Sequence, residues 1–262
     1  MSPIVGERTS HAPGTFSWVD LATSDPDGAK AFYPRLFGWQ YEDMASAGGT
    51  YTMFRLDGKD VAACFAQGAG DAPPHWNSYV TVDSVDASAS RAAELGGSVA
   101  MPGRDVEGIG RMAVITDPTG APFALWEPHG QVGAELVNAP GALCWNDLGT
   151  TDVDGAMAFY GGLFGWTYQQ RLEEDPLRYM RIHNGDSENG SVHLRGEDEH
   201  GAPPHWDVYF ATPDVDASNS KLARLGGEVL VPPHDVPAGG RVSVVADPQG
   251  AAFGLFDGPL DP

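Results

Sequence analysis

The sequence has little cysteine, little lysine and no long apolar run. Only two of its 262 residues are cysteines, Cys64 and Cys144, which excludes both a disulfide framework and a cysteine-rich metal site. No apolar stretch approaches the roughly 20 residues that a membrane-spanning helix requires. The first residues also lack the basic and then apolar pattern of a signal peptide, so we expect a cytoplasmic protein without a membrane partner.

Basic residues are scarce relative to acidic ones. Fifteen Lys and Arg residues stand against 36 Asp and Glu residues, giving a formal net charge of −21. Such a surface repels phosphate backbones and anionic lipids, so we expect neither a nucleic-acid nor a membrane partner. A neutral or cationic small ligand is compatible with this charge. With 42% hydrophobic residues, the chain has enough apolar material for a globular core.

What the sequence does have is internal repetition. The segment "DAPPHWNSYV" at 71–80 returns as "GAPPHWDVYF" at 201–210, with Asp207 in the place of Asn77. Two further pairs of segments match, 17–41 with 144–168 and 111–128 with 241–258. The chain is therefore composed of two homologous halves.

The two halves are predicted to be domains, spanning residues 14–130 and 141–258. Each half repeats itself more faintly, at an offset of 59 residues in the first and 62 in the second, so four modules of roughly 60 residues make up the protein. We expect the halves to bury a substantial interface, as a linked dimer would. The chain would then be a monomer with pseudo-dimeric halves or a weak homodimer.

Each module reads as a strand, a helix and three strands, which predicts an α+β fold of four βαβββ modules. Asp25 and Pro26 fit the N-cap and first turn of the first helix, and Gly38 fits its C-cap. Pro34 is expected to kink or shorten that helix. The turn "DGKD" predicts a hairpin, and "DPTG" at 117–120, like its twin "DPQG", predicts a turn between two strands.

The paired modules, the "AFY…LFGW" helix and the "DPxG" turn resemble the vicinal oxygen chelate superfamily. This group includes glyoxalase I, bleomycin-resistance proteins, fosfomycin-resistance enzymes and extradiol dioxygenases. The resemblance covers nearly the whole chain and is nearest to tandem glyoxalase-like bacterial proteins, often labelled hydroxylases. It implies two glyoxalase-like domains with curled mixed sheets, helices outside and a ligand on the concave face. Whether each cup forms within one half or between the halves stays open.

The resemblance also implies where a metal would bind. Enzymes of the superfamily hold a divalent metal through a His on the first strand of one module, a His on the first strand of the next, and a Glu on the last strand. These positions fall on Trp18, Asn77 and Ala124 in the first half, and on Trp145, Asp207 and Gly254 in the second. Because only Asp207 is a credible ligand, we expect no metal and no other cofactor.

Candidate ligand-binding residues follow from the period of two along strands. Residues on the same face as the missing ligands would line the cups, and aromatic walls with a few polar groups suit flat organic ligands. The candidates are Phe16, Trp18, Asn77, Tyr79, Ala124, Trp126, Trp145, Asp207, Tyr209 and Phe256. The alternative is that these aromatic residues only fill the core.

Asp20 and Asp147 are twin residues on the inward face of a strand and are the catalytic candidates. A carboxylate in an aromatic cup should have a raised pKa and could act as a general base, or it could only accept hydrogen bonds. Four further residues are interpreted as structural, with the arginines paired to local acids: His75, His205, Arg111 and Arg241.

Several functions are compatible with these features. The first is a metal-free small-molecule-binding protein for a planar aromatic metabolite or antibiotic. The second is a metal-independent enzyme or accessory factor, hydroxylase-like, acting on an aromatic polyketide-type metabolite. The third is a metal-dependent lyase or dioxygenase whose ligands have been misaligned, and the last is a structural or interaction role.

Overall fold

A computed structural model describes residues 6–46, 48–68, 72–106, 108–170, 178–196, 202–237 and 239–260. The first half contributes helices α1 (Pro26–Phe37) and α2 (Val85–Glu94) and strands β1 (Phe16–Thr23), β2 (Gln40–Ser46), β3 (Gly49–Leu56), β4 (Lys59–Ala66), β5 (His75–Thr81), β6 (Ser98–Val106), β7 (Gly110–Thr116) and β8 (Pro122–Pro128). The second half contributes helices α3 (Val153–Phe164) and α4 (Val215–Arg224) and strands β9 (Leu143–Thr150), β10 (Thr167–Gln170), β11 (Met180–Asn184), β12 (Ser187–Leu194), β13 (His205–Ala211), β14 (Glu228–Asp235), β15 (Arg241–Ala246) and β16 (Ala252–Phe256). The predicted α+β fold of four βαβββ modules is confirmed.

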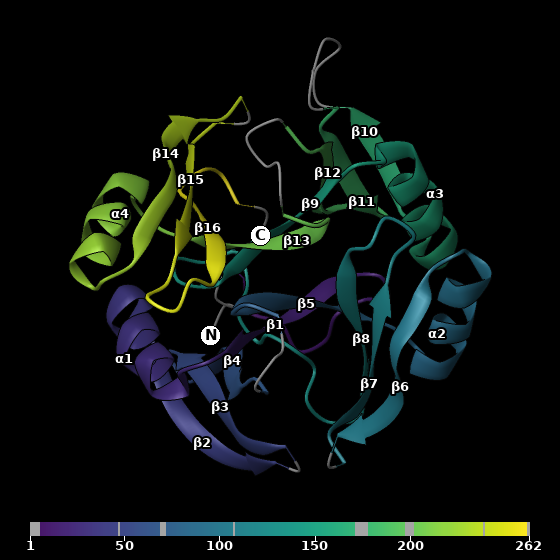
Figure 1. Cartoon of the computed structure of the whole chain (residues 1–262), viewed down its shortest axis with the longest axis horizontal. Coiled ribbons are helices and arrows are strands. Elements are labelled where there is room, and N and C mark those ends of the chain that lie inside the picture. Colours follow the sequence, from purple (N-terminus) through teal and green to yellow (C-terminus); the bar gives the residue numbers. More distant parts are fainter. Residues whose placement is uncertain are drawn as a thin grey trace.

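Each half forms one curled, mixed sheet of eight strands (Figure 1). The order is β2-β3-β4-β1-β5-β8-β7-β6 in the first half and β10-β11-β12-β9-β13-β16-β15-β14 in the second. The two modules of a half meet at an antiparallel central pair, β1 with β5 or β9 with β13, and each central strand has a parallel neighbour on its other side. Each concave face is therefore built within one half.

The local signals of the first module act as the sequence predicts, with one exception. The Asp25 carboxylate caps α1 by accepting the Gly28 N–H, and Gly38 ends the helix in the left-handed region with a φ of 81°. Pro34 lies inside α1 but does not shorten it, because the Gly38 N–H bonds to the Pro34 carbonyl and closes the turn that follows. The "DGKD" hairpin forms between β3 and β4.

The helices lie outside the sheets, and each core on the helix side is shared by both halves. In Figure 1, α1 lies beside α4 on one side of the molecule and α2 beside α3 on the other. The first core contains Tyr33 and Phe54 from the first half and Phe210 and Phe253 from the second. The second core joins α2, β7 and β8 to α3, β11 and β12 in the same way. The expected interface between the halves is present.

The repeated motifs make hydrogen bonds across this interface. The Tyr33 hydroxyl of the "AFY" segment donates to the buried Asp247 carboxylate of the opposite "DPQG" turn at 3.0 Å, and within the same half as Tyr33 the Trp76 indole of "PPHW" donates to the Tyr33 hydroxyl at 3.2 Å. The twin bonds run from Tyr160 to Asp117 at 3.0 Å and from Trp206 to Tyr160 at 2.9 Å. These tyrosine, tryptophan and aspartate side chains of the motifs therefore lie in the cores between the halves and do not line the concave faces.

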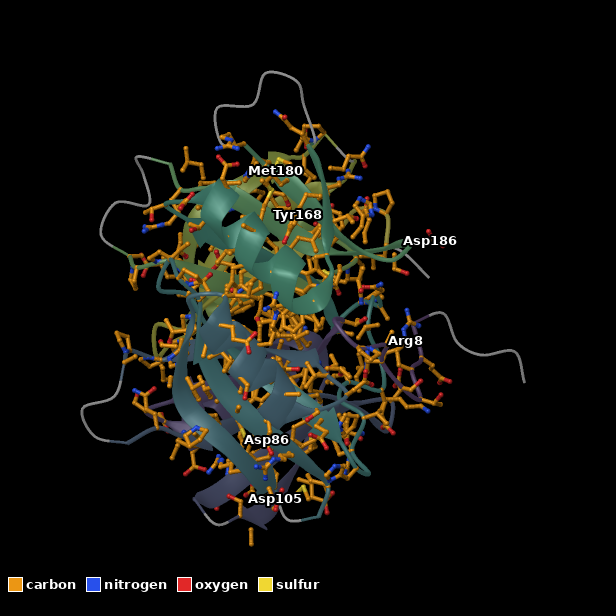
Figure 2. The ribbon with its side chains drawn as sticks, turned by 90° about the vertical axis from the view of Figure 1, so that its right-hand side faces the viewer. Arg8, Asp86, Asp105, Tyr168, Met180 and Asp186 are labelled. Atoms are coloured by element: carbon orange, nitrogen blue, oxygen red, sulfur yellow. The ribbon has the colours of Figure 1, made fainter. Side chains whose placement is uncertain are left out.

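The paired arginines hold the ends of the curled sheets. Arg111 bonds to Asp86 and Asp105 at 2.9 and 2.8 Å, and these two acids lie close together at one end of the molecule in Figure 2. Arg241 pairs in the same way with Asp216 and Asp235. The interpretation of both arginines as partners of local acids is confirmed. Among the described residues, no helix has the length and apolar character needed to span a membrane.

Candidate functional site

Each sheet has a concave face on the side away from its helices, and we name these faces the N cup (β1–β8) and the C cup (β9–β16). In β1, Val19 and Leu21 pack in the core on the helix side. Trp18 and Asp20 alternate with them and face the N cup, where their register partners in β5 are Tyr79 and Asn77. The sequence prediction that β1 and β5 bring these side chains together is therefore confirmed.

Asp20 is the centre of a hydrogen-bond network in the N cup. Tyr51 and Tyr79 donate their hydroxyls to one carboxylate oxygen at 3.0 and 2.8 Å, and the Asn77 amide donates to the other at 2.9 Å. The Trp18 indole N–H in turn donates to the Tyr51 hydroxyl at 3.0 Å. Asp20 is 1% exposed, so every one of these donors offsets the cost of burying a carboxylate.

Burial changes the ionisation of this network. It raises the pKa of Asp20, and the three donors only partly oppose that rise. Burial also raises the pKa of Tyr51 and Tyr79 well above the usual value, and the nearby Asp20 charge adds to the effect. Because the carboxylate is covered by its own neighbours, its raised pKa reflects a structural role as readily as a catalytic one.

The N cup is filled by its own side chains. Trp18, Tyr79 and Trp126 are 5%, 7% and 6% exposed and pack with Ala124 in a single cluster. The linker between the halves closes over them, because Ala134 belongs to the same cluster and bonds to the Ser17 carbonyl at 2.7 Å. The N-cup aromatic residues thus lie together as the sequence predicted. They are packed against one another and leave little aromatic surface exposed to solvent.

Phe16 does not share this face, and its placement in the cup was wrong. The register of β1 against β5 shifts between Phe16 and Trp18, as in a β-bulge, which moves Phe16 to the other side of the sheet. Its ring centroid lies 5.4 Å from that of Trp166 and 4.8 Å from that of Trp206, in the core shared with the second half.

The C cup contains a different polar network. Asp147, the twin of Asp20, accepts a hydrogen bond from the Ser191 hydroxyl at 2.6 Å, and Ser191 accepts one from the Trp145 indole at 2.7 Å. His193 Nδ1 lies 3.1 Å from the second Asp147 oxygen. Ser191 and His193 come from β12, where their register partners in β9 are Asp147 and Gly149.

Asp207 has a different partner from its counterpart Asn77. A carboxylate cannot donate to Asp147 as the Asn77 amide donates to Asp20; Asp207 lies instead 3.3 Å from His205 Nε2. This partner raises the pKa of His205 to about 9. The His205 Nδ1 and the Pro203 carbonyl are 2.8 Å apart, a contact that His75 repeats with Pro73. The "PPHW" histidines are thus fixed by their own loops, as interpreted.

The walls of the C cup are smaller and less covered than those of the N cup. Val242 replaces Met112, Gly254 replaces Ala124 and Phe256 replaces Trp126 at equivalent register positions. Trp145, Tyr209 and Phe256 are half-buried, whereas their N-cup counterparts are buried. The C cup therefore offers aromatic surface that the N cup does not.

Sequence reasoning missed the contribution of β11 and β12. Matching "AACFA" at 62–66 to "GSVHL" at 190–194 places Ser191 at the position of Ala63 and His193 at that of Phe65. The ring contacts support this alignment. Tyr179 stacks on His193 with centroids 6.2 Å apart, and Tyr51 stacks on Phe65 with centroids 6.3 Å apart. The alternation of Ser191 and His193 with the apolar Val192 and Leu194 was the signal that could have identified them.

The residues of neither cup fit the metal that the superfamily enzymes hold. The indole nitrogens of Trp18 and Trp145 donate hydrogen bonds, and an indole N–H has no lone pair for a metal. At the position of the Glu ligand, a Cβ added to Gly254 would overlap the Tyr209 ring. Within the described part of the chain, no three His, Cys, Asp or Glu residues are grouped as a metal site requires.

Two cavities of about 290 and 260 Å³ lie outside both cups. The first is lined by the end of α1 and the start of α4, including Phe37 and Lys221. The second is lined by loop residues beside β5 and β8, including His11 and His129. Neither cavity is lined by any of the aromatic or acidic residues that the sequence analysis placed in the cups.

The sequence matches one family model in two segments. The model is that of the Glyoxalase/Bleomycin resistance protein/Dioxygenase superfamily, and it matches residues 15–125 and 143–255. The chain belongs to this superfamily. The match covers one segment in each half, so the resemblance inferred from the repeated motifs is confirmed.

The relatives within the superfamily have several names. The chain is 42% identical over 255 residues to "Putative glyoxylase CFP32" of Mycobacterium tuberculosis, covering 95% of this chain and 97% of that protein. It is 35% identical over 272 residues to the anthracycline biosynthesis protein DnrV of Streptomyces peucetius, covering 95% of each. Its length and two-half organisation are therefore common to both relatives.

Solved structures of a glyoxalase and of a dioxygenase share the fold. The Mn(II)-bound glyoxalase from Novosphingobium aromaticivorans has a TM-score of 0.68 at 17% identity, covering 95% of this chain and 83% of that one. The 2,2',3-trihydroxybiphenyl 1,2-dioxygenase of Sphingomonas wittichii has a TM-score of 0.68 at 16% identity, covering 95% and 92%. At such identities the likeness shows the fold alone.

Proposed function

We propose that this protein binds a planar aromatic metabolite on the C cup without a metal. The observation that carries the proposal is the difference in exposure between equivalent residues of the two cups. Trp145, Tyr209 and Phe256 remain half-buried, whereas Trp18, Tyr79 and Trp126 are packed. Exposed aromatic faces beside a few fixed polar groups are how proteins hold flat organic ligands.

The polar groups of the C cup could bind a ligand in one orientation by hydrogen bonds. Asp147 and Asp207 come from adjacent strands and are register partners, and each has a histidine within ion-pair distance. Arg181, the register partner of Ser191 in β11, adds a positive charge held by Glu188 at 2.5 Å. A ring system that carries hydroxyl and carbonyl groups would find both donors and acceptors on this face.

The ligand class is supported by the relatives. One relative is named for the biosynthesis of an anthracycline, a compound built on fused aromatic rings. A fused ring of this kind matches the indole and phenol faces of Trp145 and Tyr209 in shape. Binding would proceed without a metal, because neither cup presents the three ligands that the metal enzymes of the superfamily use.

Titration of the chelator-treated protein with 1,8-dihydroxyanthraquinone, followed by tryptophan fluorescence and calorimetry, tests the proposal. We expect one molecule bound per chain and an affinity that Trp145→Ala weakens by about tenfold or more, because a stacking face and its buried area are lost. Trp145→Phe should cost less, since it keeps an aromatic face. Circular dichroism checks that the variants are folded. Unchanged affinity in a folded Trp145→Ala variant would contradict the proposal.

A second function, a metal-independent enzyme, is supported by one specific observation. The only histidine on β12, His193, lies against Asp147 on the face where we place the ligand. The N cup has Phe65 at that position, so of the two cups only the C cup, whose aromatic walls are half-buried, has this pair.

A further inference from the structure

The second cavity, of about 260 Å³, lies outside both cups at the ends of β5 and β8. The N-terminal segment also contributes to it. Five of the lining residues have polar side chains, namely His11, Thr81, Asp83, Glu127 and His129. Among the described residues that line this cavity there is no lysine or arginine. The lining therefore offers carboxylates, imidazoles and a hydroxyl without a fixed positive charge.

The second half of the chain does not repeat this polar lining. Strand register fixes the comparison, because Thr81 pairs with Trp126 as Ala211 pairs with Phe256. Two prolines, an alanine and an asparagine stand at the equivalent positions: Pro213 for Asp83, Pro259 for His129, Ala211 for Thr81 and Asn138 for His11. The common frame thus folds without these four polar residues.

Glu127 is the lining residue whose role both halves share. Its Oε2 accepts the Val85 N–H at the start of α2 at 2.9 Å, and Asp257 accepts the Val215 N–H at the start of α4 at 3.0 Å. In the first half His129 Nε2 also lies 3.0 Å from Glu127 Oε1. The Val85 bond, and then the His129 contact, lower the pKa of Glu127. Glu127 is therefore an ionised helix cap that also faces the cavity.

The Thr81 hydroxyl is buried without a hydrogen-bond partner in the described part of the chain. Thr81 is 3% exposed. Its backbone is held on both sides, since its N–H donates to the Thr15 carbonyl at 2.9 Å and its carbonyl accepts the Gly14 N–H at 2.8 Å. A buried hydroxyl without a bond costs free energy. Because Thr81 lines the cavity, a polar group bound there would supply the missing partner.

His11 presents an acceptor at the same cavity. Its Nε2 lies 2.8 Å from the Ala134 carbonyl oxygen, and a carbonyl can only accept, so Nε2 carries the proton. Burial lowers the pKa of His11, which the bond to Ala134 opposes only in part, and the charge of Arg8, which does not line the cavity, also lowers it. The ring is then neutral at neutral pH, and its Nδ1 has a free lone pair.

We propose that this cavity binds a small primary ammonium ion with an apolar body, at a site separate from the C cup. An ammonium ion has three N–H donors and no acceptor, which matches the Asp83 carboxylate, the Thr81 hydroxyl oxygen and His11 Nδ1. The hydrocarbon body packs on the apolar part of the lining, Pro13, Val82 and Pro128. The net charge of −21 raises the local concentration of cations around the protein.

The test compares three probes of the same shape and different charge: cyclohexylamine, cyclohexanol and cyclohexanecarboxylate. Calorimetry at neutral pH and low ionic strength measures their affinities for the full chain. We expect one cyclohexylammonium ion per chain, bound at least about tenfold more tightly than the alcohol or the carboxylate, because hydrogen bonds between charged groups are the stronger ones. Added salt should weaken this binding. NMR should show shifts of the His11 ring signals, which His11→Asn identifies.

Two variants test the residues of the site. Asp83→Asn, at an exposed position, should weaken binding of cyclohexylammonium by about fivefold or more, because the carboxylate is lost. Thr81→Ala, which introduces the residue of the second half, should weaken it by about threefold or more. The control is Glu228→Gln at the start of β14, which removes one exposed charge away from the cavity and should leave the affinity unchanged. Circular dichroism checks the fold of each variant.

Several results would overturn the proposal. One is the absence of saturable binding of cyclohexylammonium, and another is equally tight binding of cyclohexanol. Unchanged affinity in folded Asp83→Asn would refute the site even if Thr81→Ala failed to fold. Equal losses in Asp83→Asn and Glu228→Gln would mean diffuse attraction to an acidic surface. Competition between cyclohexylammonium and 1,8-dihydroxyanthraquinone would place the ion in the C cup, and this outcome leaves the proposed function standing.

Discussion

The N cup and the C cup are built on the same frame, yet the aromatic side chains of the first are buried and those of the second are half-buried. In the N cup, bulky Met112 and Trp126 fill the space and the linker residue Ala134 covers it. In the C cup, Val242 and Phe256 occupy the equivalent positions and polar residues come from β11 and β12. The proposed function assigns the binding site to the second half, because its aromatic side chains are less buried than their counterparts in the first half.

The largest effect is expected from filling the C cup with the residues of the N cup. Val242→Met combined with Phe256→Trp should weaken binding of 1,8-dihydroxyanthraquinone by about 100-fold or more, because the added bulk takes the space of the ligand. Calorimetry measures the loss. The frame already accepts these side chains in the first half, so the thermal midpoint should change little.

The matched control opens the N cup. Met112→Val combined with Trp126→Phe should lower the thermal midpoint, since buried atoms are removed from a packed cluster, and should leave binding unchanged. Loss of binding in this variant, with binding retained when the C cup is filled, would reverse the assignment of the two cups.

A smaller effect, on stability, is expected from Asp20→Asn. The variant leaves two tyrosine hydroxyls facing an amide group, and we expect it to lower the free energy of unfolding by about 1–3 kcal/mol. The loss should depend on pH. Because burial raises the pKa of Asp20 above its unfolded value of about 3.9, the stabilisation by this carboxyl is complete below that pH and is lost as the pH rises through the folded pKa.

Urea unfolding of the parent protein and of Asp20→Asn across this pH range measures the difference. The destabilisation should be greatest in acid and shrink toward neutral pH. A difference that grows with pH would mean that Asp20 is stabilised as a carboxylate, and the account of the N-cup network would need to be replaced.

The smallest effect concerns the Asn/Asp difference between the cups. Asp207→Asn should bring the pKa of His205 from about 9 toward the ordinary value of about 6.5, because the carboxylate that stabilises the imidazolium is removed. An NMR titration of the His205 ring in both proteins measures the shift. If the pKa stays near 9 in the variant, the 3.3 Å contact with Asp207 is not its cause.

Much of the fold was predictable from local signals and repetition. The N-cap at Asp25, the C-cap at Gly38 and the "DPxG" turns mark element ends through short-range chemistry that needs no knowledge of the rest of the chain. The pairing of Tyr33 with Asp247 was not predictable, since the two residues are 214 positions apart and the bond depends on how the halves pack.

The site was predictable only in part. Alternation correctly placed Trp18, Asp20 and Tyr79 together, because the β1–β5 register is regular there. It misplaced Phe16, because the register shift beside it lets the ring pack in the core that the two halves share. Ser191 and His193 were missed because the search followed the ligand positions of metal enzymes, none of which lies on β12.

The most direct test of the central claim is fluorine NMR of protein labelled with 5-fluorotryptophan. The seven tryptophans give seven signals, which single Trp→Phe variants assign. On addition of 1,8-dihydroxyanthraquinone to chelator-treated protein, the account predicts a large shift of the Trp145 signal and little change in that of Trp18. A shift of Trp18 with Trp145 unmoved would contradict it, as would binding that appears only after a divalent metal is added.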